Sequence, residues 1–148
     1  SGTIFQGLTR NPLADPSIIG ISTGASLAAV AVIVLFPAAP VYALPFSALA
    51  GALLMAGLIY GLAWNRGSSP ILLILMGIGL SAIASAFTSL LITFGSIYDV
   101  SQALVWLAGS VYGRTWEQVF SFLPWLIVFV PVAFGLARHL NVLNLGED

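Results

Sequence analysis

The stretch that decides the fold is GTIFQGLTRNPLADPSIIGISTGA, residues 2–25. It places a charged turn with two prolines between two apolar segments. Asn11-Pro12 and Asp15-Pro16 each predict a helix start, because an N-cap residue is followed by proline at the first helical position, where the missing N–H costs nothing. Between apolar segments, such a turn is expected at a membrane surface, where one helix ends and the next begins.

The composition of the whole chain also indicates a protein that lies in the lipid bilayer. The 148 residues are 59% hydrophobic and 6% charged, and their mean hydropathy is +1.07. A water-soluble domain of this length could not bury so much apolar surface. The net charge of -1 and the absence of cysteine argue against a nucleic-acid-binding face, a disulfide framework or a thiolate metal site. We therefore expect residues 1–148 to form a single transmembrane domain.

Four apolar stretches have about the 20 residues that a membrane-spanning helix needs. They are residues 17–36, 45–64, 70–94 and 119–137, and residues 1–11 resemble half of a further helix. Between the last two spans, Ser101 to Ala108 predicts a short surface helix that Gly109 ends as a C′ glycine. The expected fold is all-α: half a helix, four transmembrane helices and a short helix outside the membrane.

The arginines predict which way the spans run, because Lys and Arg accumulate on the cytoplasmic side. If Arg10 lies inside, four alternating spans place Arg66 and Arg138 inside as well and leave Arg114 outside. The aromatic residues around Arg114 favour an interfacial anchor for it over a role in docking a partner.

Small residues recur at every fourth position of the predicted helices. One ridge on the third span holds Gly77, Ser81, Ser85 and Ser89, and the others are Gly20-Gly24-Ala28 and Gly57-Gly61. Such ridges let helices approach closely in lipid. The serine ridge has a second interpretation as the wall of a polar passage, because a hydroxyl that faces lipid lacks a partner unless it bonds to its own helix.

Two short motifs resemble catalytic or cofactor-binding signatures. Gly20-Ile-Ser-Thr-Gly24 matches a nucleophile elbow, but that elbow needs a strand and a histidine partner, and His139 lies at the far end of another span. Residues 77–82 fit a dinucleotide-binding pattern, but the helix that follows lacks the polar, solvent-exposed face that a dinucleotide-binding fold requires. No set of His, Asp or Glu has metal-ligand spacing, so we expect no enzyme, no cofactor and no metal site.

The pattern Gln6-x-x-x-Arg10-Asn-Pro-Leu-Ala-Asp15-Pro16, followed by Gly20 and Gly24-Ala25, resembles the signature of the FecCD-type permeases. These are the membrane subunits of bacterial ABC importers for iron-siderophores, haem and cobalamin. The resemblance covers the whole chain and corresponds to the middle of such a permease, from about its second to its sixth transmembrane helix. It implies a multi-pass protein of the bacterial inner membrane whose short helix lies on the periplasmic side.

The resemblance also implies partners. They are a second permease copy or half, ABC ATPase subunits that hydrolyse the ATP, a periplasmic substrate-binding protein and the lipid bilayer, with no nucleic acid. The family's coupling region, which docks into the ATPase, would begin where this chain stops, at Gly146 and Glu147. We therefore expect the 148 residues by themselves to lack active uptake.

The same resemblance assigns further residues to the transport path. The cytoplasmic gate would be formed by two turns, which contain Asn11 with Leu13 and Ser68 with Ser69. The span that begins at Pro70 would line the translocation pathway with Ser81, Ser85 and Ser89. The periplasmic mouth would be formed by the short helix and the residues that follow it: Leu104, Trp106, Gly109 and Arg114. Sequence alone leaves open whether that helix acts as a lid over a pore or only lies at the interface.

Two functional hypotheses remain. The first is a permease subunit, or a fragment of one, that translocates an iron-siderophore, haem or cobalamin-type metal chelate. The alternative is a small self-associating helical membrane protein whose spans bundle through their Gly and Ser ridges, without transport activity of its own.

Overall fold

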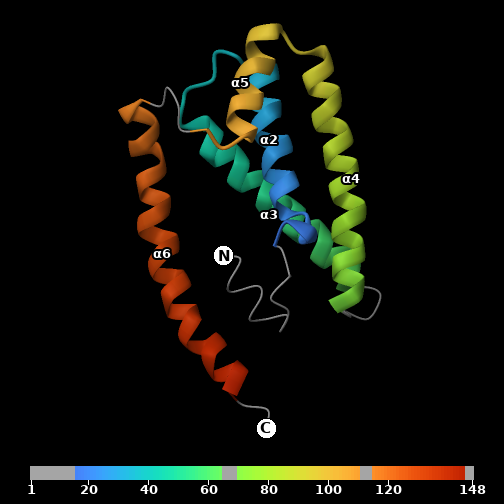
Figure 1. Cartoon of the computed structure of the whole chain (residues 1–148), viewed down its shortest axis with the longest axis vertical. Helices are drawn as coiled ribbons and strands as arrows, with labels where there is room; N and C mark the ends of the chain where they lie inside the picture. Colours follow the sequence, from blue (N-terminus) through green and yellow to red (C-terminus); the bar gives the residue numbers. More distant parts are fainter. Residues whose placement is uncertain (1–15, 65–69, 111–114, 146–148) are drawn as a thin grey trace.

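The computed structural model describes residues 16–64, 70–110 and 115–145, which form one 3₁₀ turn and five α-helices. The all-α prediction is confirmed. Helices α2 to α5 pack into one group, and α6 runs beside this group with its lower half pointing away from it (Figure 1). The half helix predicted for residues 1–11 lies outside the described residues.

The first predicted span is interrupted. Pro16–Ile19 forms the 3₁₀ turn η1, and the α-helix α2 is confined to Ile21–Leu35. Gly20 separates them with φ +85°, in the left-handed region that glycine adopts without strain. The prediction of one helix from Ser17 to Phe36 is therefore wrong at its start. With 15 residues, α2 is about 22 Å long, which is shorter than the hydrocarbon core of a bilayer, about 30 Å.

Three described helices are long and apolar enough to cross a membrane. Helix α3 is Ala43–Trp64, α4 is Pro70–Phe94 and α6 is Trp116–Leu145. The bounds of α4 are those predicted, whereas α3 begins two residues earlier than expected and α6 extends beyond its predicted span at both ends. The Thr115 N–H donates to Gln118 Oε1 over 3.1 Å, which is one of the two hydrogen bonds of a capping box at the start of α6.

The short helix α5 is Ile97–Leu107, so its predicted start at Ser101 is wrong. Ser96 is the N-cap: its hydroxyl accepts from the Asp99 N–H over 3.3 Å and donates to Asp99 Oδ2 over 2.6 Å. Gly109 follows the helix with φ +67°, and its N–H donates to the Trp106 carbonyl over 3.0 Å. The prediction that Gly109 ends this helix is confirmed.

Helix α2 lies at the centre of the packed group and contacts α3, α4 and α5. One core cluster joins Val30 and Ile33 of α2 to Ala103 of α5. A second cluster joins Met55 and Ile59 of α3 to Ala84 of α4. Helix α6 contributes to neither cluster, and its side chains from 116 to 136 are all exposed or half-buried.

Glycines set the two closest helix crossings. A Cβ on Gly24 of α2 would lie 2.7 Å from the Gly51 carbonyl oxygen and 2.6 Å from the Met55 Cβ, both in α3. Where η1 meets α4, a Cβ on Gly20 would meet the Ser81 hydroxyl and lie 2.7 Å from the Gly77 carbonyl oxygen. The ridge at Gly20, Gly24 and Ala28 is thus a packing surface. Gly57 and Gly61 have open space around them within the described chain.

Candidate functional site

The serine ridge of α4 turns from the core of the bundle to its surface. Gly77 is buried, Ser81 is half-buried, and Ser85 and Ser89 are exposed. The cause is geometric, since four residues exceed one helical turn of 3.6 residues and each step moves the ridge about 40° around the axis. The ridge therefore has a packing end and an exposed end.

Hydrogen bonding separates the same two ends. Ser81 Oγ donates to the Gly77 carbonyl over 2.7 Å, at the contact with Gly20. Thr88 donates in the same manner to the Ala84 carbonyl over 2.9 Å. Within the described residues, the side-chain hydroxyls of Ser85 and Ser89 have no hydrogen-bond partner. These two hydroxyls face outward from an apolar helix and remain available to water or to a ligand.

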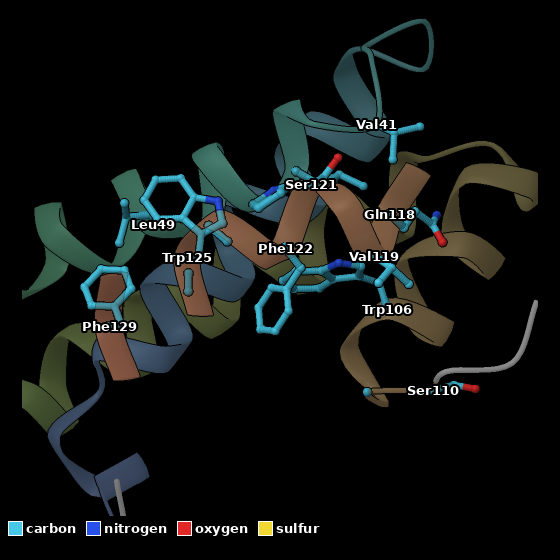
Figure 2. Close-up of a pocket in the computed structure, with 15 residues that line it drawn as sticks. Val41, Leu49, Trp106, Ser110, Gln118, Val119, Ser121, Phe122, Trp125 and Phe129 are labelled. Atoms are coloured by element: carbon cyan, nitrogen blue, oxygen red, sulfur yellow. The ribbon is translucent and has the colours of Figure 1, made fainter. Parts of the chain in front are cut away.

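A cavity of about 970 Å³ lies between α3, α5 and α6. Figure 2 shows its walls: Leu49 comes from α3, Trp106 from α5, and Phe122, Trp125 and Phe129 from α6. The walls are mostly apolar, and the polar side chains of Ser110, Gln118 and Ser121 also line it. An apolar cavity with a few polar groups is the ordinary form of a small-molecule or helix-binding site.

Aromatic contacts hold α6 against this cavity. The rings of Phe46 in α3 and Trp125 in α6 meet edge to face, with centroids 5.0 Å apart and an interplanar angle of 75°. Trp125 also stacks on Phe129, one turn further along α6, with centroids 6.1 Å apart. Residues 116–136 of α6 have no buried side chain, so the contact between Trp125 and Phe46 of α3 is an important part of their attachment.

The residues predicted for the periplasmic mouth separate in the structure. Trp106 and Gly109 both line the cavity. Leu104 is 51% exposed and does not line it, and Arg114 lies outside the described residues. Sequence reasoning missed the α6 wall, although Gln118, Phe122, Trp125 and Phe129 follow one another at the helical spacing of four, three and four that marks a common face.

The remaining predicted residues lie outside the described part of the chain: Asn11, Leu13, Ser68 and Ser69 of the gate, and Gly146 and Glu147 of the coupling region. The described residues beside the two gate turns pack together. Ile19 follows the first turn, and Ile59 and Leu73 flank the second. All three belong to one hydrophobic cluster, so the ends of η1, α3 and α4 that lead to these turns lie at one end of the bundle.

Within the described residues, the motif that resembles a nucleophile elbow does not have the geometry of one. Ser22, the serine of the elbow-like motif, is exposed in the first turn of α2 and follows a left-handed glycine, not a strand. Among the described residues, no three His, Cys, Asp or Glu side chains come together as metal ligands would. What the described chain does offer is a partly polar helix face and an aromatic cavity.

Comparison with known proteins gives a consistent answer over the whole chain. Residues 1–148 match the FecCD transport family. The chain is 44% identical to the Fe(3+)-citrate import system permease protein YfmE of Bacillus subtilis, over all of this chain and 44% of that protein. It is 42% identical to the iron(3+)-hydroxamate import system permease protein FhuG of the same organism, over all of this chain and 46% of that protein. The chain therefore spans less than half the length of these relatives.

A solved structure has the same fold. It is an inward-facing conformation of a protein assigned to the metal-chelate type of ABC transporter. The TM-score is 0.81 at 29% identity, and the match covers 99% of this chain and 46% of that one.

Proposed function

Because the chain belongs to the FecCD transport family, we propose that it is a segment of the membrane permease of a bacterial ABC importer that carries an iron(III) chelate. The observation that carries this proposal is the continuous match over residues 1–148. The relatives named for Fe(3+)-citrate and iron(3+)-hydroxamate import favour an iron chelate built from carboxylate or hydroxamate groups.

The exposed face of α4 is the proposed wall of the translocation pathway. Ser85 and Ser89 present hydroxyls without partners in the described chain, which is unfavourable against lipid and favourable against a hydrated passage. Ser81 has a different role, because its hydroxyl bonds to its own helix and packs against Gly20. We therefore assign Ser85 and Ser89 to the pathway and Ser81 to the helix contact.

The cavity beside α5 is the proposed periplasmic mouth. Trp106 closes the α5 side of the cavity, and Gly109 lies where the chain leaves that helix. Helix α5 is short and is fixed to the bundle mainly by Ala103 and Trp106, which pack on Val30 and Ile33. A small helix held by few contacts is suited to move as a lid.

We retain Asn11, Leu13, Ser68 and Ser69 as the proposed cytoplasmic gate. The common cluster of Ile19, Ile59 and Leu73 at that end of the bundle supports this proposal. The proposed partners are a second permease copy, ABC ATPase subunits that bind near Gly146 and Glu147, and a periplasmic substrate-binding protein. The proposed location is the bacterial inner membrane.

Uptake by a reconstituted complex tests the function. The complete permease is placed in proteoliposomes with its ATPase and binding protein, and the entry of radiolabelled iron is followed with iron(III) citrate and with an iron(III) hydroxamate. We expect ATP-dependent entry of one of these chelates. If neither chelate enters in the presence of binding protein and ATP, the proposed cargo class is refuted.

Thiol accessibility tests the pathway in the same preparation. Ser85→Cys should react with a charged, water-soluble thiol reagent, because it faces the proposed passage. Ile83→Cys is the matched control: it lies two residues away, about 3 Å along the axis and nearly half a turn around it, and is 55% exposed in the described chain. Equal reactivity at the two positions would remove the case for a polar wall on the serine side.

A further inference from the structure

Two prolines inside α6 free two carbonyl groups of a membrane-spanning helix, one near the start of the span and one near its middle. Pro124 and Pro131 both lie within Trp116–Leu145. Proline has no N–H, so the carbonyls of Phe120 and Ile127, four residues before each proline, have no α-helical donor. In hydrocarbon, a backbone acceptor without a partner costs several kcal/mol.

The two carbonyls lie on the same side of α6. They are seven residues apart, which is nearly two full turns and about 10 Å along the axis. Phe120 and Ile127 are 63% and 64% exposed. We call the surface formed by Phe120, Pro124, Ile127 and Pro131 the proline face. It lies roughly half a turn away from the side of Gln118, Trp125 and Phe129 that faces the cavity.

The described side chains of α6 offer these carbonyls no free hydroxyl group. The one hydroxyl side chain between residues 116 and 136 is Ser121. That hydroxyl donates to the Glu117 carbonyl over 2.9 Å, so it is not available to the Phe120 or Ile127 carbonyl. Gln118 accepts from the Thr115 N–H and lines the cavity on the other side.

We propose that the proline face binds another transmembrane helix of the same permease, one that lies outside these 148 residues and carries two hydrogen-bond donors. The donors would be Ser, Thr, Asn or Gln side chains about 10 Å apart, to match the spacing of the Phe120 and Ile127 carbonyls. Membrane helices tolerate proline where a neighbouring helix satisfies the freed groups. The relatives supply such helices, since the chain spans 44% and 46% of their length.

This inference rests on the proposed function, because it requires a longer permease around the chain. It differs from the role of α6 in the cavity, which uses the opposite side of the helix. It predicts that α6 is covered on two sides, by α3 through Trp125 and Phe46 and by a helix with polar donors through the proline face.

Photo-crosslinking in the assembled transporter tests the inference. p-Benzoylphenylalanine is incorporated at Ile127 of the complete permease, assembled with its ATPase in lipid nanodiscs, and the products are identified by mass spectrometry. We expect mainly an intrachain crosslink to a transmembrane peptide outside these 148 residues, with a Ser, Thr, Asn or Gln within one helical turn of the crosslinked site. A mainly lipid adduct, a crosslink to the second permease copy, or a crosslink to a helix without such a donor would overturn the proposal.

The matched control carries the same photoreactive residue at Phe129, two residues away on the cavity side. It should crosslink to α3 near Leu49, which lines the same cavity, and this product shows that α6 is rotated as described. Neither measurement uses ATP or cargo. A permease that fails the iron-uptake test therefore still gives a decisive answer about the proline face.

Discussion

Gly20 lies so close to Ser81 that a single methyl group on Gly20 would meet the Ser81 hydroxyl. The contact joins the start of α2 to the packing end of the serine ridge on α4. It also depends on backbone geometry, because Gly20 has φ +85° and a residue with a Cβ is strained there.

Gly20→Ala should destabilise the permease by more than the strain of the left-handed conformation, which is about 1–2 kcal/mol. The added Cβ would also lie 2.7 Å from the Gly77 carbonyl oxygen, a backbone atom that cannot move away as a side chain can. The double variant Gly20→Ala with Ser81→Gly should recover only part of the lost stability, because the contact with the Gly77 carbonyl oxygen remains. Thermal unfolding in detergent measures the effect, and Gly57→Ala, in open space inside α3, is the control that should not destabilise, because alanine favours a helix interior over glycine.

Gly24→Leu should separate α2 from α3. The Gly51 carbonyl and the Met55 side chain both lie within 3 Å of where a Cβ would be, so a larger side chain has no room. We expect loss of the folded permease from the membrane fraction. Gly61→Leu adds the same bulk to the surface of α3, where nothing lies within 4 Å in the described chain; an equal loss there would mean that side-chain size alone is responsible.

The Phe46–Trp125 pair should show a measurable coupling energy. Edge-to-face pairs contribute about 0.5–1.5 kcal/mol beyond the area that they bury, and this pair joins α6 to α3 beside the cavity, which Trp125 also lines. A double-mutant cycle with Phe46→Leu and Trp125→Leu measures the coupling from unfolding in detergent. The pair Tyr60–Trp64 lies within one helix and is the comparison. Additive single mutants at Phe46 and Trp125 would show that α6 is held by other contacts.

Ser96→Ala should loosen α5 without unfolding the bundle. Losing an N-cap costs about 1 kcal/mol, which corresponds to roughly fivefold more frequent opening. Amide hydrogen exchange over residues 97–107 should therefore be faster by about that factor, with exchange in α2 unchanged. Ser101→Ala, which is exposed within the same helix, should leave exchange as it is. If α5 is the lid, iron uptake should change with Ser96→Ala and not with Ser101→Ala.

The sequence predicts helix boundaries most accurately where a local start or stop signal, such as proline or glycine, coincides with the end of an apolar stretch. Helix α4 has its predicted bounds because proline opens it at Pro70 and Gly95 follows its end. The sequence predicts the start of α5 four residues too late, because Ser101 offers a polar start, whereas Ser96 and Asp99 form the cap in the structure. The break at Gly20 was missed because an apolar stretch contains no local mark that distinguishes a left-handed glycine from a helical one.

The candidate site was harder to predict, because its residues meet only through tertiary packing. The sequence analysis predicts the ridge at Gly20 and Gly24 but not its partner Gly51, although Ala43, Ser47 and Gly51 are small residues at the same spacing in α3. The serine ridge has two explanations in the sequence, and the structure turns Ser81 toward a helix contact and Ser85 to the surface; a pathway role for Ser85 stays a proposal. The aromatic wall of α6 showed a helical repeat, but an aromatic repeat in a membrane helix does not reveal which neighbour it faces.

The short central helix also constrains how this protein is made. Helix α2 leaves the ribosome before α3, α4 and α5, yet it contacts all three. With 15 residues, it is below the length at which a lone apolar helix crosses the bilayer securely. We therefore expect α2 to be held in the membrane securely only once α3 has been made, because the Gly24–Gly51 crossing makes α3 its first neighbour. Substitutions at that crossing should then lower the yield of inserted protein, measured in the membrane fraction, before they affect transport.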